Sequence, residues 1–180
     1  MNKKIEELKF ILNRLDVYLE SSQNKSNLYL ALNTIVLGGV ITIIATLQEL
    51  DCSFLLNFLL LFIALASIAS ILLTLSAINP YIKSSKKTKS VFFFKDIATH
   101  NSPEEYRILL DTHIASEKKM VKDMSSQVYS MAKGLSMKYK KLTIVGFIIA
   151  GEFVLMAIWA IIFLVTKSNI IWKYLILTKM

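Results

Sequence analysis

The sequence predicts an all-α membrane protein with three transmembrane helices and a cytosolic helical bundle, whose last helix continues into the third span. Of the 180 residues, 54% are hydrophobic, a high fraction for a soluble domain, and they gather in three long runs. The chain contains only 2 prolines and 5 glycines, so little interrupts its helices. A charged, striped segment leads without a proline into the third apolar run. These observations together favour long helices that cross a bilayer.

Residues 1–25 are expected to form a cytosolic amphipathic helix. Its apolar side chains follow the alternating 3-4 spacing of a coiled-coil seam, at Ile5, Leu8, Leu12, Leu15 and Leu19. Phe10 and Ile11 widen this face. We expect the helix to pack on the protein's own cytosolic part. A helix lying on the lipid surface is the alternative, and it would carry more basic residues on its polar face.

Residues 26–82 are expected to form a two-helix transmembrane hairpin. The first span carries Asn33, which a span tolerates when the side chain faces another helix. Asn79 and Pro80 end the second span. Small residues recur in it every four positions, at Ala66, Ser70 and Thr74. This stripe is suited to close contact between helices.

Residues 83–101 are expected to be a basic linker followed by a docking segment. The lysines of the linker (KSSKKTKS) indicate a cytoplasmic location and contact with anionic lipid. They are a weaker sign of nucleic-acid binding, because they directly follow a span and lack interleaved aromatic residues. The next residues, VFFFKDIA, place three aromatic side chains in a row outside a span, and we expect them to dock against helices.

Residues 102–141 are expected to form a long cytosolic helix, continuous from Pro103 to about Thr166. Ser102 can cap its first turn, and Glu105 completes a capping box. Apolar residues then recur with a period close to 3.5, at Leu110, Ile114, Val121, Met124, Val128, Met131, Leu135, Tyr139 and Leu142. This stripe predicts a coiled-coil-like bundle with the N-terminal helix, either within one chain or between chains.

Residues 142–166 form the predicted third span, about 37 Å long, which is enough to cross a hydrocarbon core of about 30 Å. Glu152 is its only charged residue. It could line an assembled pore or hydrogen-bond to another helix, or it could be protonated and paired inside one subunit with Asn33 or with threonines. Small residues beside it would let a second helix approach. The residues predicted to act in the membrane or in an oligomer are therefore Asn33, Gly146, Ala150, Gly151 and Glu152.

Residues 167–180 are expected to form an interfacial tail anchored by Trp172 and Tyr174. The distribution of Lys and Arg predicts the orientation. There are five before the first span and thirteen in residues 83–141, but none in residues 49–52 and three after Thr166. The N-terminus and the central region should therefore be cytoplasmic, which three spans allow.

Few features of the sequence favour catalysis. No phosphate-binding loop or dinucleotide fingerprint is present, and the single Cys52 cannot form an internal disulfide. His100 and His113 lack the spacing of metal ligands. We therefore expect no enzyme, no cofactor and no metal. The absence of a short apolar segment with a cleavage site predicts that the first span is retained.

Several short motifs resemble the transmembrane effector family of bacterial Pycsar antiphage systems over roughly residues 25–158. They are Phe93-Phe94-Lys95-Asp96-Ile97-Ala98, Ser102-Pro103-Glu104-Glu105-Tyr106, Asp123 with Gln127-Val128-Tyr129, Ala132, and Lys138-Tyr139. Two positions depart from the family pattern. Gln23 stands where members often have an Asp, and no Gly lies near Lys95.

The resemblance implies a bacterial antiviral effector in the inner membrane. Such effectors respond to cyclic UMP or cyclic CMP, made by a partner cyclase during phage infection, and then impair the membrane so that infection aborts. The expected partners are this nucleotide, the bilayer and further copies of the chain, with no DNA or RNA. Two alternatives stay open: a membrane effector gated by another nucleotide messenger, such as a cyclic oligonucleotide, and a non-signalling scaffold or holin-like subunit.

The ligand site is expected at the cytosolic face, around the docking segment and the Ser102 cap. A cyclic phosphate needs a cation or a helix N-terminus, and a base needs an aromatic surface. The candidate ligand-binding residues are Lys95, His100, Tyr106, Arg107, Lys138 and Tyr139. The alternative is that these residues only dock the linker to the bundle.

Overall fold

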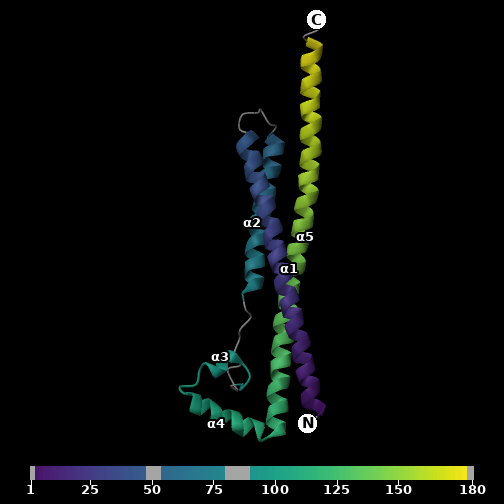
Figure 1. The fold of residues 1–180 in the computed structure, drawn as a ribbon. Coiled ribbons are helices and arrows are strands. Elements are labelled where there is room, and N and C mark those ends of the chain that lie inside the picture. The colour runs from purple at the N-terminus through teal and green to yellow at the C-terminus, as the bar shows by residue number, and fades with distance from the viewer. Residues whose placement is uncertain (1–2, 48–53, 80–89, 178–180) are drawn as a thin grey trace. The chain divides into compact units, whose positions relative to one another are not determined.

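The computed structural model describes the backbone of residues 3–47, 54–79 and 90–177, together with the side chains of these residues except Leu47 and residues 168–177. Within these ranges the chain folds into helices and contains no strand (Figure 1). The helices are α1 (Lys3–Leu47), α2 (Phe54–Ile78), α3 (Phe94–Ile97), α4 (Pro103–Ile114) and α5 (Glu117–Leu177). The predicted all-α class is confirmed. Residues 49–52 within the predicted hairpin and the lysines of the basic linker lie outside the described residues.

The chain forms two compact units. The first, which we call the head unit, comprises residues 1–24 and 79–140. The second, the membrane unit, comprises residues 25–78 and 141–180. Helices α1 and α5 contribute residues to both units, whereas α2 belongs to the membrane unit and α3 and α4 belong to the head unit.

Helix α1 combines two segments that the sequence analysis treats as separate. The predicted N-terminal helix and the predicted first span are one helix of 45 residues, with no interruption near residue 25. The predicted seam is confirmed, since Ile5 is buried and the four leucines that follow it are half-buried. The same 3-4 spacing continues to Val40. It passes through the buried or half-buried Ser22, Ser26, Tyr29, Asn33 and Val36.

The prediction of one helix from Pro103 to Thr166 is wrong at residues 115–116, where the chain leaves the helical path between α4 and α5. The Ala115 N–H still bonds to the Asp111 carbonyl, which closes α4, and the Ser116 carbonyl accepts the N–H groups of Lys119 and Met120 in the first turn of α5. Serine and the following Glu117 are residue types typical of a helix start. Just before the break, the Thr112 hydroxyl donates to the Ile108 carbonyl.

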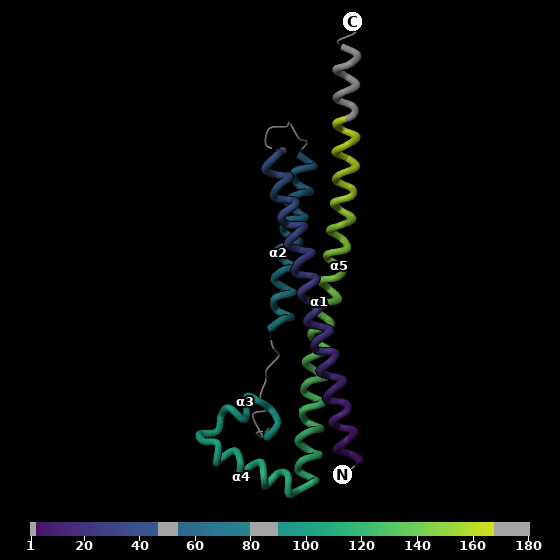
Figure 2. Tube along the Cα trace, viewed as in Figure 1, coloured from purple at the N-terminus to yellow at the C-terminus, as the bar shows by residue number. Residues whose placement is uncertain are grey.

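In the head unit, the first half of α1 packs beside the first half of α5 (Figure 2). Ile5 of α1 is buried, as are Met124 and Leu135 of α5. The Tyr139 hydroxyl lies 3.4 Å from the Tyr18 carbonyl, a long hydrogen bond between the two helices. The predicted coiled-coil-like pairing therefore forms within one chain.

Helix α4 contributes less to the core than predicted. None of its residues is fully buried, and Ile114, a member of the predicted stripe, is 55% exposed. The break at residues 115–116 is the reason, because it separates the periodicity of α4 from that of α5.

The membrane unit contains the three helices that are long and apolar enough to cross a bilayer, so the three predicted spans are confirmed. One apolar cluster lies in its core, formed by Val36, Val40, Leu56, Leu60, Ile63 and Trp159. The outer face of α2 exposes large apolar side chains, as a lipid-facing helix does. They include Phe54, Leu55, Phe58, Leu61, Phe62, Leu65, Ile68, Leu72 and Leu75.

The predicted C-terminal tail is not a separate element up to Leu177, because α5 continues to that residue. The side chains of Trp172 and Tyr174, which were predicted to anchor the tail, are not among those that the structure describes.

Candidate functional site

Two aspartates in the head unit hold the chain just before α3. The Asp96 carboxylate accepts the Ser90 N–H at 2.8 Å, and the Asp123 carboxylate accepts the Val91 N–H at 2.9 Å. The Phe92 N–H bonds to the Ser90 hydroxyl at 3.1 Å. Three consecutive backbone donors are thus satisfied by side chains in a segment without regular structure. Buried backbone donors need such partners, so these contacts fix the segment against α5.

The start of α4 is capped by its own side chains. The Glu105 N–H donates to the Ser102 hydroxyl at 3.2 Å, and the Glu105 carboxylate accepts the Asn101 N–H at 3.0 Å. The predicted Ser102 cap is confirmed. Because Pro103 has no N–H and Glu104 and Glu105 are both acidic, this helix start offers an anion fewer donors than the sequence suggests.

His100 and Tyr106 lie together beneath this cap. Their ring centroids are 5.9 Å apart, and the Tyr106 hydroxyl donates to the Val91 carbonyl at 3.0 Å. The Nδ1 atom of His100 lies 3.2 Å from the Glu105 carboxylate. The His100 side chain is only 7% exposed, and its Nε2 atom is buried with no hydrogen-bond partner in the described part of the chain. This nitrogen is a buried polar atom that the cap network leaves without a partner.

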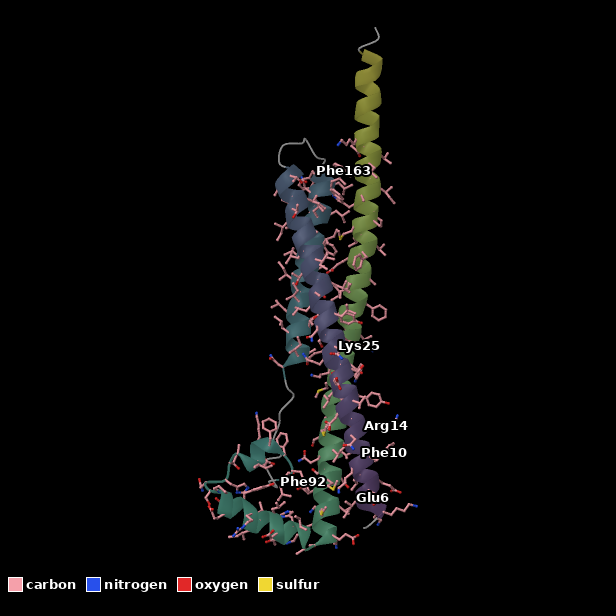
Figure 3. The ribbon with its side chains drawn as sticks, in the orientation of Figure 1. Glu6, Phe10, Arg14, Lys25, Phe92 and Phe163 are labelled. Carbon is pink, nitrogen blue, oxygen red and sulfur yellow. The ribbon has the colours of Figure 1, made fainter. Side chains whose placement is uncertain are left out.

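The other candidate ligand residues fall into two groups. Lys95 and Arg107 are exposed, and they belong to the same stretch of the chain as His100 and Tyr106. Phe92, labelled in Figure 3, lies just before this stretch and is also exposed. Lys138 and Tyr139 lie elsewhere on α5. Lys138 is 15 positions beyond Asp123, or about 22 Å along the helix. Since Asp123 holds the segment that Tyr106 contacts, a single mononucleotide cannot touch both groups.

Lys138 has a structural explanation of its own. It is half-buried at a position that continues the 3-4 spacing of α5 from Leu135 to Leu142. Burial lowers the pKa of the Lys138 ammonium group, because a low-dielectric environment disfavours its charge. The seam position explains why Lys138 is partly buried, and no ligand is needed to explain it. A lysine at such a position of a coiled coil lowers the stability of the protein.

Sequence reasoning did not single out Asp96 and Asp123 as organising residues. One signal was available, because Asp96 is the only acidic residue within an apolar segment that was expected to be buried. A buried carboxylate requires donors, and backbone amides are the nearest source. Asp123 had no comparable signal, since its partner Val91 lies 32 positions away.

A second candidate site is the polar part of the membrane unit. Glu152 lies inside this unit and is only 1% exposed. It occupies the buried seam of α5, which steps through Leu142, Val145, Ile149, Glu152 and Trp159. The Ser67 hydroxyl of α2 faces its carboxyl group. The structure therefore places Glu152 within one subunit.

Two contacts fix the level of Glu152 relative to α2. The Lys141 ammonium group donates to the Ser76 carbonyl at 3.0 Å and to its hydroxyl at 3.1 Å. From there, Glu152 lies 11 residues along α5 and Ser67 lies 9 residues along α2, about 16 and 14 Å. Both positions are near the middle of a hydrocarbon core of about 30 Å if the core begins at Lys141.

The level of Asn33 follows from a contact at Gly146. A Cβ atom added at this glycine would lie 3.1 Å from the Tyr29 hydroxyl oxygen. Asn33 is 4 residues beyond Tyr29 and Glu152 is 6 residues beyond Gly146, so their levels differ by about 3 Å. The structure brings Asn33, Gly146 and Glu152 into one interior.

The other two predicted membrane residues, Ala150 and Gly151, lie on the exposed face of α5. A Cβ atom added at Gly151 would meet nothing within 4 Å.

The family model of the Pycsar effector protein domain matches residues 7–166. The chain belongs to the Pycsar effector family. This match covers both units and all three spans, and membership implies an antiphage effector that is a multi-pass membrane protein. No curated protein and no solved structure matches the chain.

The motifs that resemble the family have a structural role in this Pycsar effector. Asp96 and Asp123 hold the segment before α3, and Tyr106 bonds to the same segment. Glu105 caps α4. Of the candidate ligand residues, Tyr106 thus has the docking contact that the sequence left as an alternative.

Proposed function

We propose that this protein senses a cyclic pyrimidine mononucleotide, cyclic UMP or cyclic CMP, and then impairs the bacterial inner membrane so that phage infection aborts. The observation that carries the proposal is the match to the Pycsar effector domain across both the head unit and the three spans. On this proposal the head unit is cytoplasmic and takes the nucleotide, and the membrane unit produces the damage. The protein binds the nucleotide without converting it.

The chemistry near α3 and α4 suits such a ligand. The exposed cations Lys95 and Arg107 can meet the cyclic phosphate, and the exposed Phe92 and Phe94 offer aromatic faces to a base. The Nε2 atom of His100 is buried without a hydrogen-bond partner, and it can bond to a ligand that displaces the side chains covering it. Lys138 and Tyr139, about 22 Å further along α5, would act in another way, through the packing of α1 on α5.

Homo-oligomerisation is part of the proposal. Three spans in one subunit are too few to enclose a wide water path, so a pore would need several copies. The exposed face of α5 that carries Ala150 and Gly151 is suited to close contact between copies, since small residues let helices approach.

Equilibrium titration of the full-length protein in mild detergent tests the ligand. Cyclic UMP, cyclic CMP and a cyclic dinucleotide are compared, and nucleotide recovery after incubation is measured to detect turnover. We expect saturable binding of a cyclic pyrimidine mononucleotide and full recovery of it. Binding of the cyclic dinucleotide alone would favour an effector gated by another messenger, and no binding at all would favour a scaffold or holin-like subunit.

A double variant tests the placement of the site. Lys95→Ala with Arg107→Ala should weaken binding by at least tenfold, because it removes both cations near α3 and α4. The matched control is Lys118→Ala with Lys119→Ala, which removes two exposed cations at the start of α5. Equal affinity for both double variants would move the site away from these residues.

A further inference from the structure

The interior of the membrane unit contains a group of buried side-chain oxygen atoms with few partners. The Ser67 hydroxyl faces the Glu152 carboxyl group, and these oxygens otherwise have no hydrogen-bond partner among the described residues. They are Asn33 Oδ1, Ser67 Oγ, Ser70 Oγ, Glu152 Oε1 and Glu152 Oε2. Buried polar atoms are normally paired, and an unpaired one costs about 1–3 kcal/mol. Five such atoms in one small unit indicate that something is held between them.

The three helices contribute these atoms at similar depths. Asn33 of α1 and Ser67 of α2 lie within about 3 Å of the level of Glu152, as the contacts of Gly146 and Lys141 fix it. Ser70 lies about one turn below Ser67 on the same buried stripe of α2. The group therefore lies in one part of the interior, with Asn33 and Ser67 at the level of Glu152 and Ser70 on the side toward Lys141.

The charges around this group are few. In the described part of the three spans, the titratable side chains are Glu152 and Tyr29. The basic residues at the ends are Lys25, Lys141 and Lys167, and Lys141 is bonded to Ser76 about 16 Å from Glu152. An ionised carboxylate without a counter-charge is unfavourable in a bilayer. A single positive charge restores neutrality, whereas a divalent ion would leave an excess.

We propose that Asn33, Ser67, Ser70 and Glu152 form a binding site for one monovalent cation, a proton or a sodium ion, inside each subunit. A proton resides on the Glu152 carboxyl group and is donated to one of the neighbouring oxygens. A sodium ion is held by the carboxylate together with the amide and hydroxyl oxygens, which are ligands that hard cations prefer. The site does not depend on nucleotide sensing.

The test is labelling of the full-length protein in detergent with a hydrophobic carbodiimide, which reacts with protonated carboxyl groups in apolar surroundings. Labelling of the Glu152 peptide is measured by mass spectrometry between pH 5 and 9, in sodium chloride or in choline chloride of equal ionic strength. We expect labelling to fall at least tenfold as pH rises. If sodium is a ligand, labelling is also slowed at least threefold in sodium chloride. Indifference to sodium assigns the site to a proton alone.

Two results would overturn the proposal. One is absence of Glu152 labelling at every pH in protein that binds nucleotide or retains its helical circular dichroism. The other is labelling that changes neither with pH nor with sodium, which would mean that water alone fills the space. Glu152→Gln provides the background of the assay, because it lacks the reactive group.

A hydroxyl variant separates a site from mere packing. Ser70→Ala removes one of the unpartnered oxygens and keeps Glu152, so it should shift the pH profile of labelling or abolish the effect of sodium. Thr42→Ala is the matched control, since this exposed hydroxyl bonds only to the Gly38 carbonyl of its own helix. If Ser70→Ala and Ser67→Ala both label as the wild type does in every condition, the hydroxyls are not ligands and the proposal fails.

Discussion

The backbone N–H of Val91 donates a 2.9 Å hydrogen bond to the carboxylate of Asp123, which lies 32 positions away on α5. This bond joins the end of the linker to the helix that runs on into the third span. Tyr106 bonds to the carbonyl of the same residue at 3.0 Å. Val91 therefore uses both of its backbone groups to hold α3, α4 and α5 together within the head unit.

Replacing Asp123 should release the segment before α3. Asp123→Ala leaves the Val91 N–H without its charged acceptor, and we expect a loss of about 1.5–3 kcal/mol in the free energy of unfolding. Hydrogen exchange of residues 90–98 should become faster than in the wild type. The control is Asp111→Ala, which changes an exposed aspartate on α4. Unchanged protection of the Val91 amide would show that the bond contributes little.

Removal of the Tyr106 hydroxyl tests the other half of this connection. Tyr106→Phe keeps the ring beside His100 and loses the bond to the Val91 carbonyl, so it should lower stability by about 0.5–1.5 kcal/mol. Tyr129→Phe serves as the control, because the Tyr129 side chain is exposed. In a double-mutant cycle with Asp123→Ala, the two losses should not add, since both variants loosen one segment. Simple additivity would contradict the shared role of Val91.

Lys138→Met should stabilise the protein at neutral pH. Burial lowers the pKa of Lys138 in the folded state below the value of about 10.4 expected in the unfolded chain. Because burial disfavours the charged form of Lys138 in the folded state, the methionine should raise Tm by about 2 °C at pH 7.

The pH dependence of Lys138→Met follows from the same shift. Between the two pKa values the unfolded chain binds more protons, so wild-type stability rises with pH and the advantage of the variant shrinks. Thermal unfolding of the wild type, Lys138→Met and the exposed control Lys140→Met from pH 7 to 10.5 checks this. A constant difference between wild type and Lys138→Met across this range would contradict it.

Gly146 and Gly151 should respond differently to a large side chain. Gly146→Leu would push against Tyr29, so we expect a loss of about 1–3 kcal/mol. Gly151→Leu meets open space, and we expect no loss of stability in the monomer. Unfolding in mixed micelles measures both. If the exposed face of α5 joins copies of the chain, Gly151→Leu should also reduce cross-linking between subunits. Equal destabilisation by the two variants would refute the arrangement in which Gly146 faces Tyr29 and Gly151 is exposed.

The sequence predicts the spans and the coiled-coil seam well, because both depend on local properties. Hydropathy and length identify the three membrane helices, and the 3-4 spacing from Ile5 onward identifies the buried face of α1. The same spacing on α5 could also have placed Glu152 in the interior, since Val145, Ile149 and Glu152 follow the seam that includes Leu142.

Contacts between distant residues could not be predicted in the same way. The break at residues 115–116 falls between Ile114 and Val121, where the apolar spacing continues without change, so periodicity does not report it. The pairing of Val91 with Asp123 depends on how α3 and α4 fold back toward α5. For this reason the predicted ligand set combined His100 and Tyr106 with Lys138 and Tyr139, which the structure separates.

On the proposed function, a cyclic pyrimidine mononucleotide switches this protein from harmless to membrane-damaging. The most direct measurement uses purified full-length protein in liposomes made of bacterial lipids, loaded with a fluorescent dye. We predict that cyclic UMP or cyclic CMP releases the dye within minutes, while linear UMP and CMP do not, and that the Lys95→Ala, Arg107→Ala double variant needs at least tenfold more nucleotide. Dye release that is equal with and without either cyclic nucleotide, or absent with both, would contradict the account.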